Sequence, residues 1–269
     1  MSSLTSFVVI YHEEEVLERC LESVASISDE IIVIHDGPCQ DRSLDIARKY
    51  TDNVIVAERT GFGEFHRVKA MSLASSEWIL QLDADEFLSE EAQKKIPELI
   101  KDPKIDGYKL LWKLWDGAKY ISNETPHKSV LFRKSKMYYI SFPGTEMSSY
   151  GKVKSTQLHL EHRPTYNNYT LKVFYSKWIK WIKIHASFMG KSNIEHFNAD
   201  TATLSAVKEK MTKHIKYSGV FFSPAWFAMS TFKALFKHKY YRNVSGWKVS
   251  FLQGLYAFYL CLFIARENK

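Results

Sequence analysis

Short apolar runs alternate with amphipathic segments through the first hundred residues, and this alternation constrains the fold more than any other feature. The apolar runs are residues 7–11, 31–34, 54–57 and 78–82. The segments between and after them have helical spacing of apolar residues, and they are residues 13–26, 41–50, 65–74 and 89–100, the last capped by Ser89. Apolar strands separated by helices predict an α/β fold with a mostly parallel central sheet that is covered on both faces.

The pattern changes twice further along the chain. Residues 108–115, 130–133 and 156–162 are longer, aromatic-rich strand candidates, and the chain becomes helical beyond Tyr166. We therefore expect a catalytic domain over residues 1–165 and a helical region over residues 166–269 that packs on it. The sequence contains no internal repeat and no low-complexity linker.

Charge is distributed unevenly along the 269 residues. Residues 1–150 hold 18 Lys and Arg against 25 Asp and Glu, whereas residues 151–269 hold 19 against 5. A basic face of this kind suits nucleic acid, an anionic membrane or a phosphorylated ligand, and composition does not choose among them.

The three cysteines are scattered without C-x-x-C spacing, which excludes a disulfide framework and a zinc knuckle and favours a reducing compartment. Residues 1–5 have no basic n-region, so we expect no secretory signal peptide.

Polar residues follow three of the four predicted strands, where ligands bind in parallel sheets. The three groups are His12 and Glu13, His35 and Asp36, and Asp83 and Asp85. The last group is the sharpest signal, because two carboxylates at i and i+2 on a strand tip can both reach one hard cation. Mg²⁺ and Mn²⁺ prefer oxygen ligands and complete their shell with substrate phosphates. The alternative is a solvated acidic turn that caps the next helix.

Five segments resemble those of the family-two glycosyltransferases and occur in the same order. They are FVVIYHEEEVLERCLESV, EIIVIHDG, GFGEFHRVKAMSLASSEWILQLDADE, GTEM and LHLEH, and together they extend over residues 4–166. The resemblance implies the A-type, Rossmann-like glycosyltransferase fold. Within that family, the chain is most similar to bacterial transferases that build the lipopolysaccharide core and related cell-surface polysaccharides.

The resemblance also implies a set of nucleotide-sugar contacts. Tyr11 and Glu13 stand where the family's first strand approaches the nucleotide base, and Asp36 stands where an acidic residue contacts the uracil or ribose. Arg67 follows a GFG stretch on the nucleotide side. The sequence departs from the family at His12, which replaces an Asn, and at His35, which replaces an Asp.

The metal site is implied in the same way. Asp85 and, through its loop, Asp83 stand in the family's D-x-D, which holds the metal and the sugar diphosphate. Relatives also place a His near the metal, and His159 has the better register for it, with His162 as the alternative. Residues i and i+3 of a strand face opposite sides, so at most one of these histidines can reach the site.

An inverting sugar transfer needs a carboxylate that takes the proton of the acceptor hydroxyl. Glu146, in the segment GTEM, matches the position where relatives carry an acidic residue. Glu86 is a weaker alternative for this base, and Glu146 has the alternative of being an ordinary loop carboxylate.

The C-terminal third combines basic and aromatic residues. Residues 169–189 form an amphipathic helix with a lysine arc, and residues 217–263 contain 15 aromatic residues. The longest uncharged run, residues 249–265, has 17 residues, at the lower end of what a membrane span needs. This favours a docked or interfacial helix over a true span. For residues 169–189, the first interpretation is core packing beneath a solvated lysine face, and the alternative is a lysine face against anionic lipid headgroups.

The sequence therefore predicts a metal-dependent transferase that uses Mn²⁺ or Mg²⁺. It would move a sugar, with inversion, from a UDP-linked donor to a glycan or lipid-linked acceptor in surface-polysaccharide synthesis. We expect it on the cytoplasmic face of the cell membrane, bound peripherally to anionic lipid, and not on nucleic acid, because no RNP, KH or helix-turn-helix pattern is present. The alternatives are a sugar-phosphate nucleotidyltransferase and a non-catalytic membrane- or RNA-binding module.

Overall fold

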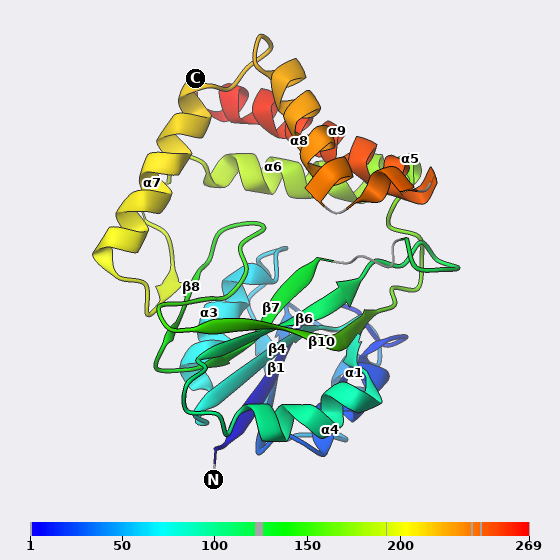
Figure 1. Cartoon of the computed structure of the whole chain (residues 1–269), viewed down its shortest axis with the longest axis vertical. Coiled ribbons are helices and arrows are strands. Elements are labelled where there is room, and N and C mark those ends of the chain that lie inside the picture. The colour runs from blue at the N-terminus through cyan, green and yellow to red at the C-terminus, as the bar shows by residue number, and fades with distance from the viewer. Residues whose placement is uncertain (1, 122–125, 192, 238, 243, 269) are drawn as a thin grey trace. The chain divides into compact units, whose positions relative to one another are not determined.

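A computed structural model describes residues 2–121, 126–191, 193–237, 239–242 and 244–268 (Figure 1). The chain divides into two compact units. The first unit contains residues 1–113, 126–165 and 195–198, and the second contains residues 114–125, 166–194 and 199–269. Residues 114–125 and 195–198 thus depart from the single boundary near residue 165 that the sequence suggests. Residues 196–197 belong to the first unit because they pair with one of its strands.

The first unit is built on an eight-stranded sheet. Its strands are β1 (Leu4–Ile10), β2 (Glu30–Asp36), β3 (Val54–Ala57), β4 (Trp78–Asp83), β5 (Glu86–Leu88), β6 (Gly107–Lys113), β7 (His127–Arg133) and β10 (Val153–His162). They lie in the order β3-β2-β1-β4-β7-β6-β10-β5. The pairings β2–β3, β1–β2, β1–β4 and β6–β10 are parallel, and the pairings β4–β7, β6–β7 and β5–β10 are antiparallel. The predicted α/β fold with a mostly parallel sheet is confirmed.

A smaller sheet completes the first unit. It contains β8 (Met137–Ile140), β9 (Ser148–Ser149) and β11 (His196–Phe197) in the order β11-β8-β9.

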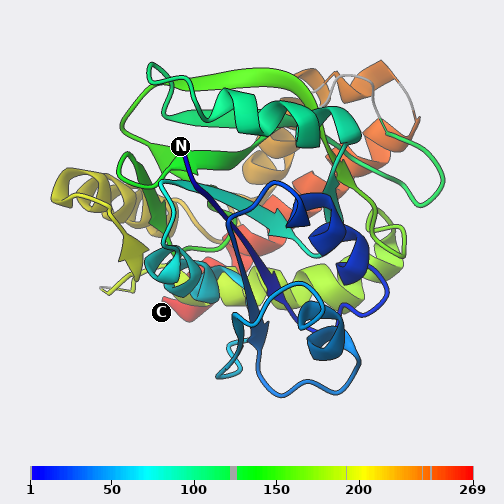
Figure 2. The same ribbon diagram turned by 90° about the horizontal axis from the view of Figure 1, so that it is seen from below.

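Helices cover both faces of the large sheet, as continuous apolar strands require. They are α1 (Leu17–Ala25), α2 (Ser43–Ala47), α3 (Glu64–Leu73) and α4 (Glu90–Leu99). Residues of α1, α2 and α4 pack in one core with Leu4 and Val8 of β1, and residues of α3 pack in a second core with Phe7. In Figure 2, β1 (dark blue) accordingly passes between α4 and α3. The predicted cap of α4 is confirmed, since Ser89 Oγ accepts a hydrogen bond from the Ala92 N–H at 3.2 Å.

The second unit is helical. It contains α5 (Leu171–Val173), the π-helical turn η1 (Phe174–Trp178), α6 (Ile179–Phe188), α7 (Thr201–Lys216), α8 (Ser223–Lys237), the 3₁₀ turn η2 (Tyr240–Arg242) and α9 (Val244–Glu267). The predicted amphipathic helix over 169–189 corresponds to α5, η1 and α6, which bury Phe174, Ile182 and Ala186. By length and composition α9 could cross a membrane, with a mean hydropathy of 1.5 in its most apolar window, 39% of which is buried. One such helix is weak evidence for a span.

Candidate active site

The ends of five strands meet at one edge of the large sheet. Because β1 runs parallel to both β2 and β4, their carboxyl ends lie together, with Ile10 opposite His35 and Val9 opposite Asp83. Strand β7 runs antiparallel to β4, so its first residues lie at this same edge. Strand β10 ends there too, because His162 pairs with Glu86 of β5. The topology thus gathers side chains from segments far apart in the sequence.

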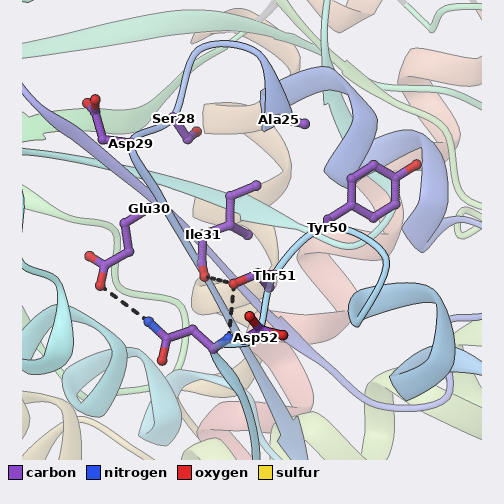
Figure 3. Close-up of a pocket in the computed structure, with 9 residues that line it drawn as sticks. Ala25, Ser28, Asp29, Glu30, Ile31, Tyr50, Thr51 and Asp52 are labelled. Carbon is purple, nitrogen blue, oxygen red and sulfur yellow. Dashed lines mark hydrogen bonds between the residues drawn. The ribbon is translucent and has the colours of Figure 1, made fainter.

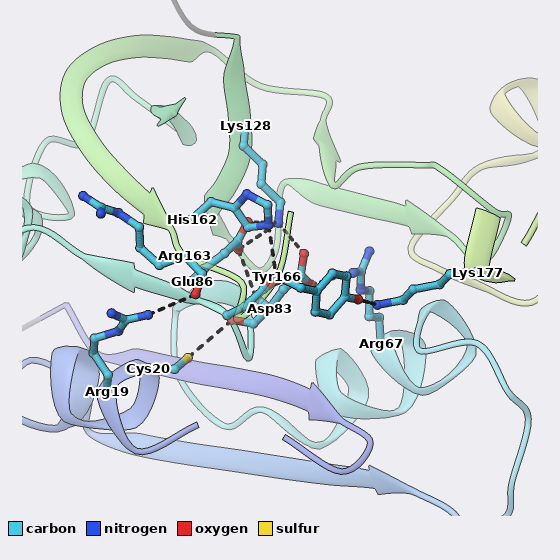
Figure 4. Close-up of polar contacts among 11 residues, drawn as sticks. Arg19, Cys20, Arg67, Asp83, Glu86, Lys128, His162, Arg163, Tyr166 and Lys177 are labelled. Atoms are coloured by element: carbon cyan, nitrogen blue, oxygen red, sulfur yellow. Dashed lines mark hydrogen bonds and ion pairs between the residues drawn. The ribbon is translucent and has the colours of Figure 1, made fainter. Parts of the chain in front are cut away.

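Lys128 is the centre of a charged cluster at this edge (Figure 4). Its Nζ lies 2.7 Å from Asp83 Oδ2 and 2.6 and 2.8 Å from the two carboxylate oxygens of Glu86. Arg67 Nη2 donates to the other oxygen of Asp83 at 2.8 Å. The aspartate therefore has a cation on each oxygen. Lys128 belongs to none of the sequence motifs that indicate the site.

Electrostatics within this cluster differ between the two carboxyl groups. Burial alone would raise the pKa of Asp83, but the charges of Lys128 and Arg67 hold it well below its usual range. Glu86 is buried, with 1% of its surface exposed, and this burial raises its pKa despite the opposing effect of Lys128. Asp83 is thus the firmly ionised member of the cluster.

Asp85 and His162 form a second pair beside this cluster. His162 Nε2 lies 3.2 Å from Asp85 Oδ2, and the imidazole packs against the ring of Trp112 with centroids 4.9 Å apart. Burial would lower the pKa of His162, but its hydrogen bond to Asp85 and the charges of Asp85 and Glu86 raise it overall. The Asp85 side chain is 27% exposed, so it faces solvent from the strand tip.

This pair fits a divalent cation better than Asp83 does. A six-coordinate cation with bonds of about 2.0–2.1 Å puts neighbouring ligand atoms about 3 Å apart, close to the separation of Asp85 Oδ2 and His162 Nε2. Imidazole suits Mn²⁺ less than oxygen does but is an accepted ligand type for transition metals. Both oxygens of Asp83, in contrast, already accept from Arg67 and Lys128.

The two histidines of β10 lie on opposite faces of the strand. Leu158, Leu160 and His162 alternate on the buried face of the strand, so His159 projects from the other face. The nearest carboxylate to His159 is that of Glu161, with Nδ1 and Oε1 3.9 Å apart. Of the two histidines, His162 is therefore the one that lies beside Asp85. The register of β10 against β6 shifts between Ser155 and His159, an irregularity that strand periodicity alone does not reveal.

The Asp36 carboxylate is occupied by contacts with other residues of the protein. It is 3% exposed and its Oδ1 accepts from the Thr60 N–H at 2.6 Å and faces His66 Nε2 at 2.8 Å, while Oδ2 accepts from the Gly61 N–H at 2.9 Å. Burial alone would raise its pKa, but these hydrogen bonds lower it. Its evident task is to hold the turn at residues 60–61 against the end of β2.

Tyr11 and Glu13 lie at the end of β1, as expected. The Tyr11 ring is 41% exposed, and the Arg59 guanidinium lies 3.2 Å from its centroid. The Glu13 N–H donates to Ser43 Oγ at 2.8 Å, which fixes the turn before α1 to the start of α2. An exposed ring beside an arginine is a suitable platform for a nucleotide base.

Glu146 is an exposed carboxylate on the turn after Gly144. Its Oε2 accepts a hydrogen bond from the Ser129 N–H at 3.2 Å, and Ser129 directly follows Lys128 on β7. Glu86, the alternative base, is buried and bound to Lys128 through both oxygens. Of the two, Glu146 is the one that can receive a proton from an external hydroxyl.

A surface pocket of about 510 Å³ lies at the opposite end of β2, where the strand begins (Figure 3). Its lining includes Asp29, Glu30 and Asn53, and the last two are joined by a hydrogen bond. Because this is the amino end of β2, the pocket is on the far edge of the sheet from the charged cluster.

Comparison with known proteins identifies the family. The sequence model of glycosyl transferase family 2 matches residues 5–153, more than half of the chain, and the protein therefore belongs to this family. An uncharacterized glycosyltransferase of Rickettsia typhi is 33% identical over 109 residues, which cover 40% of this chain and 36% of that protein. The match thus spans about a third of the length of this relative.

Solved structures show weaker similarity. TarS of S. aureus (residues 1–349) superposes with a TM-score of 0.44 and 14% identity, over 93% of this chain and 90% of that one. Glucosyl-3-phosphoglycerate synthase of Mycobacterium tuberculosis, solved with Mg²⁺ and UDP, has a TM-score of 0.42 and 12% identity, over 61% of this chain and 72% of that one.

Proposed function

We propose that the protein transfers a sugar, with inversion, from a UDP-sugar to the hydroxyl of a glycan or lipid-linked acceptor, with Mn²⁺ or Mg²⁺ held by Asp85 and His162. The observation that carries this proposal is the Asp85–His162 pair beside the Asp83–Arg67–Lys128 cluster at the carboxyl edge of the sheet. The choice of UDP and of inversion follows the family resemblance. Surface polysaccharide or lipopolysaccharide synthesis is the pathway that the resemblance favours.

In this mechanism each residue has a separate task. The bound cation would neutralise the departing diphosphate. Arg67 and Lys128 fix Asp83 at the strand tip, and Tyr11 offers its exposed ring to the base. The acceptor oxygen attacks the anomeric carbon as the bond from that carbon to the diphosphate oxygen breaks, and the hydroxyl proton passes to Glu146. Catalysis is then mainly charge stabilisation and positioning.

A donor panel tests this function. Thermal unfolding is measured with UDP-, GDP-, CMP- and dTDP-sugars, each with Mn²⁺ and with EDTA, because a ligand that binds the native state raises its stability. We expect a Mn²⁺-dependent rise with UDP-sugars in the wild type and in the exposed control Asp45→Asn, and none in Asp85→Asn. The same rise in EDTA would contradict the metal assignment, and no rise with any donor would contradict the activity.

We also propose that the second unit docks peripherally on an anionic membrane at its cytoplasmic face. Large apolar side chains on and just before α8 are well exposed: Phe221 at 96%, Met229 at 72%, Phe232 at 61% and Phe236 at 60%. Lysines lie among them at positions 233 and 237, and residues 151–269 carry 19 basic against 5 acidic residues. Exposed aromatics flanked by lysines suit the boundary between headgroups and acyl chains.

Vesicle flotation of the full chain tests the docking. Lys233→Gln/Lys237→Gln should weaken binding to anionic vesicles more than the matched pair Lys208→Gln/Lys210→Gln on α7, which removes the same charge from another exposed face. Phe232→Ser/Phe236→Ser should reduce the part of binding that survives high salt. Equal effects of the two lysine pairs, or no flotation of the wild type, would contradict this surface.

A further inference from the structure

We propose that His12, His35 and Asp41 form a second metal site, for a structural Zn²⁺ or a similar borderline transition-metal ion, which ties the loop after β1 to the loop after β2. Each of the three residues offers a ligand atom, and these atoms all lie within 4.8 Å of one another. None of its residues belongs to the Asp83–Asp85 cluster, so the site can be tested separately from the metal site of the transferase proposal.

His35 has the hydrogen bonding of a metal ligand. Its side chain is fully buried, and its Nδ1 lies 2.7 Å from the carbonyl oxygen of Gly37. A carbonyl only accepts, so Nδ1 carries the proton and Nε2 carries the lone pair. Nε2 is buried and has no hydrogen-bond partner. Metal-bound histidines characteristically donate one ring N–H to a carbonyl or carboxylate and present the other nitrogen to the ion.

His12 points to the same conclusion from its backbone. Its φ of 54° lies in the left-handed region, which residues other than glycine adopt rarely. Its ring centroid lies 5.5 Å from that of His35, and its Nε2 is likewise buried without a partner. This unfavourable backbone conformation brings the unpaired Nε2 of His12 close to the unpaired Nε2 of His35. Binding of one ion by both nitrogens would explain it.

Asp41 supplies the carboxylate. It accepts from the N–H and Oγ of Ser43, at 3.0 and 2.9 Å, and from the Glu14 N–H at 3.2 Å. Burial alone would raise its pKa, but these hydrogen bonds and that of Cys39 lower it to about 2, so the group is ionised at neutral pH.

The remaining contact of Asp41 is the Cys39 thiol, with Sγ 3.1 Å from Oδ1. A thiol is the weakest donor among the groups that contact Asp41. If the Cys39 hydrogen bond is broken, one lone pair of the Asp41 carboxylate becomes free to bind the ion. Because its Sγ lies beside Asp41, Cys39 would become a fourth ligand if its side chain turned toward the ion, in which case the thiol proton is released to solvent and the thiolate binds.

The chemistry of the donors selects the kind of ligand. Both free imidazole nitrogens are buried, so the ligand is small, and a nucleotide base would have to displace the surrounding chain to reach them. Two neutral imidazoles and a carboxylate suit Zn²⁺ and its neighbours, whereas Mg²⁺ prefers oxygen alone. The ion would also fix Tyr11, whose ring lies 3.9 Å from that of His12 and 5.8 Å from that of His35.

Zinc binding to the full-length protein tests the site. The chelator-treated protein is titrated with Zn²⁺ against a competing chromophoric chelator. Since loss of one ligand weakens a site at least as much as loss of a supporting contact, we expect the affinity of His35→Gln and His12→Asn to fall by at least roughly 10–100-fold. His12→Asn is chosen because asparagine tolerates the left-handed backbone, so that variant should still fold. His196→Gln, on β11, is the matched control and should bind like the wild type.

Two further measurements separate this site from the transferase site. Asp85→Asn should retain tight Zn²⁺ binding, even if it abolishes transfer. Co²⁺ in place of Zn²⁺ should give the visible bands of a tetrahedral complex, and a thiolate charge-transfer band that Cys39→Ser removes would assign Cys39 as the fourth ligand. Failure of the wild type to bind Zn²⁺ at micromolar concentration, or unchanged binding in both His12→Asn and His35→Gln, would overturn the proposal.

Discussion

Replacement of Lys128 by Met should destabilise the first unit more than removal of either of its carboxylate partners. The ammonium group is the cation for Glu86, whose side chain has no exposed surface, and one of two cations for Asp83. Its removal leaves a buried carboxylate without its cation, with the Asp83 N–H still donating to it at 2.9 Å, and breaking a buried pair in this way costs about 3–5 kcal/mol. Because burial already raises the pKa of Glu86, this group can take up a proton instead, and we expect the lower end of that range, about 3 kcal/mol.

A double-mutant cycle isolates the Lys128–Glu86 interaction. Glu86→Gln alone should cost only about 1–2 kcal/mol, since Lys128 keeps Asp83 as its partner at 2.7 Å. Lys128→Met/Glu86→Gln should cost less than the sum of the two single variants, by about 1–2 kcal/mol, because the buried charge is gone. Lys95→Met, an exposed lysine on α4 that contacts Glu98, is the control and should cost less than about 1 kcal/mol.

Urea unfolding read by hydrogen exchange in β1 and β4 is the appropriate assay, because it reports the first unit separately from the second. An effect of Lys128→Met within about 1 kcal/mol of the Lys95 control would refute the reasoning. So would strict additivity in the cycle, because most of the expected cost comes from leaving the buried Glu86 carboxylate without its cation.

Three further predictions follow from individual contacts. Glu146→Gln should lower the transfer rate by roughly 10²–10⁴ with little change in donor affinity, and an equal loss of donor binding in steady-state and binding assays would assign the residue another role. Burial, with His214 and Lys210 nearby, lowers the pKa of His185 from 6.5 to about 4, so the unfolded chain takes up this proton first on acidification. The second unit should therefore lose about 2–3 kcal/mol between these pH values through His185, and His185→Gln should remove this part of the loss in pH-dependent unfolding, leaving the part due to His214, whose pKa burial also lowers. Ser89→Ala removes the cap of α4 and should cost about 1 kcal/mol in thermal unfolding; no change would mean that water replaces the bond.

The strands of the first hundred residues could be predicted from the sequence because their apolar runs are continuous. Strand β3 has the predicted bounds, and β2 extends the predicted 31–34 only to Glu30–Asp36. The first helix begins four residues later than predicted, at Leu17, because the preceding residues form a turn whose Glu13 N–H bonds to Ser43. Periodicity describes the buried face of an element well, but not where its end is held by a distant side chain.

The composition of the site depends on strand order, which local patterns do not contain. Lys128 precedes an apolar run in the sequence, but its importance arises only because β7 runs antiparallel beside β4 and brings it to Asp83. The choice of His162 over His159 depends likewise on which face of β10 is buried. Asp36 matches a family position, yet its hydrogen bonds to the turn at residues 60–61 are long-range contacts invisible to the motif.

The central claim, that Asp85 and His162 hold the metal that binds the donor diphosphate, is tested most directly by UDP binding with and without Mn²⁺. Calorimetric titration of the wild type should show an affinity for UDP that rises at least about tenfold when Mn²⁺ replaces EDTA. Asp85→Asn and His162→Gln should each lose this rise, and His159→Gln, on the opposite face of the same strand, should retain it. Equal affinity of the wild type in Mn²⁺ and EDTA, or loss of the rise in His159→Gln but not in His162→Gln, would contradict the account.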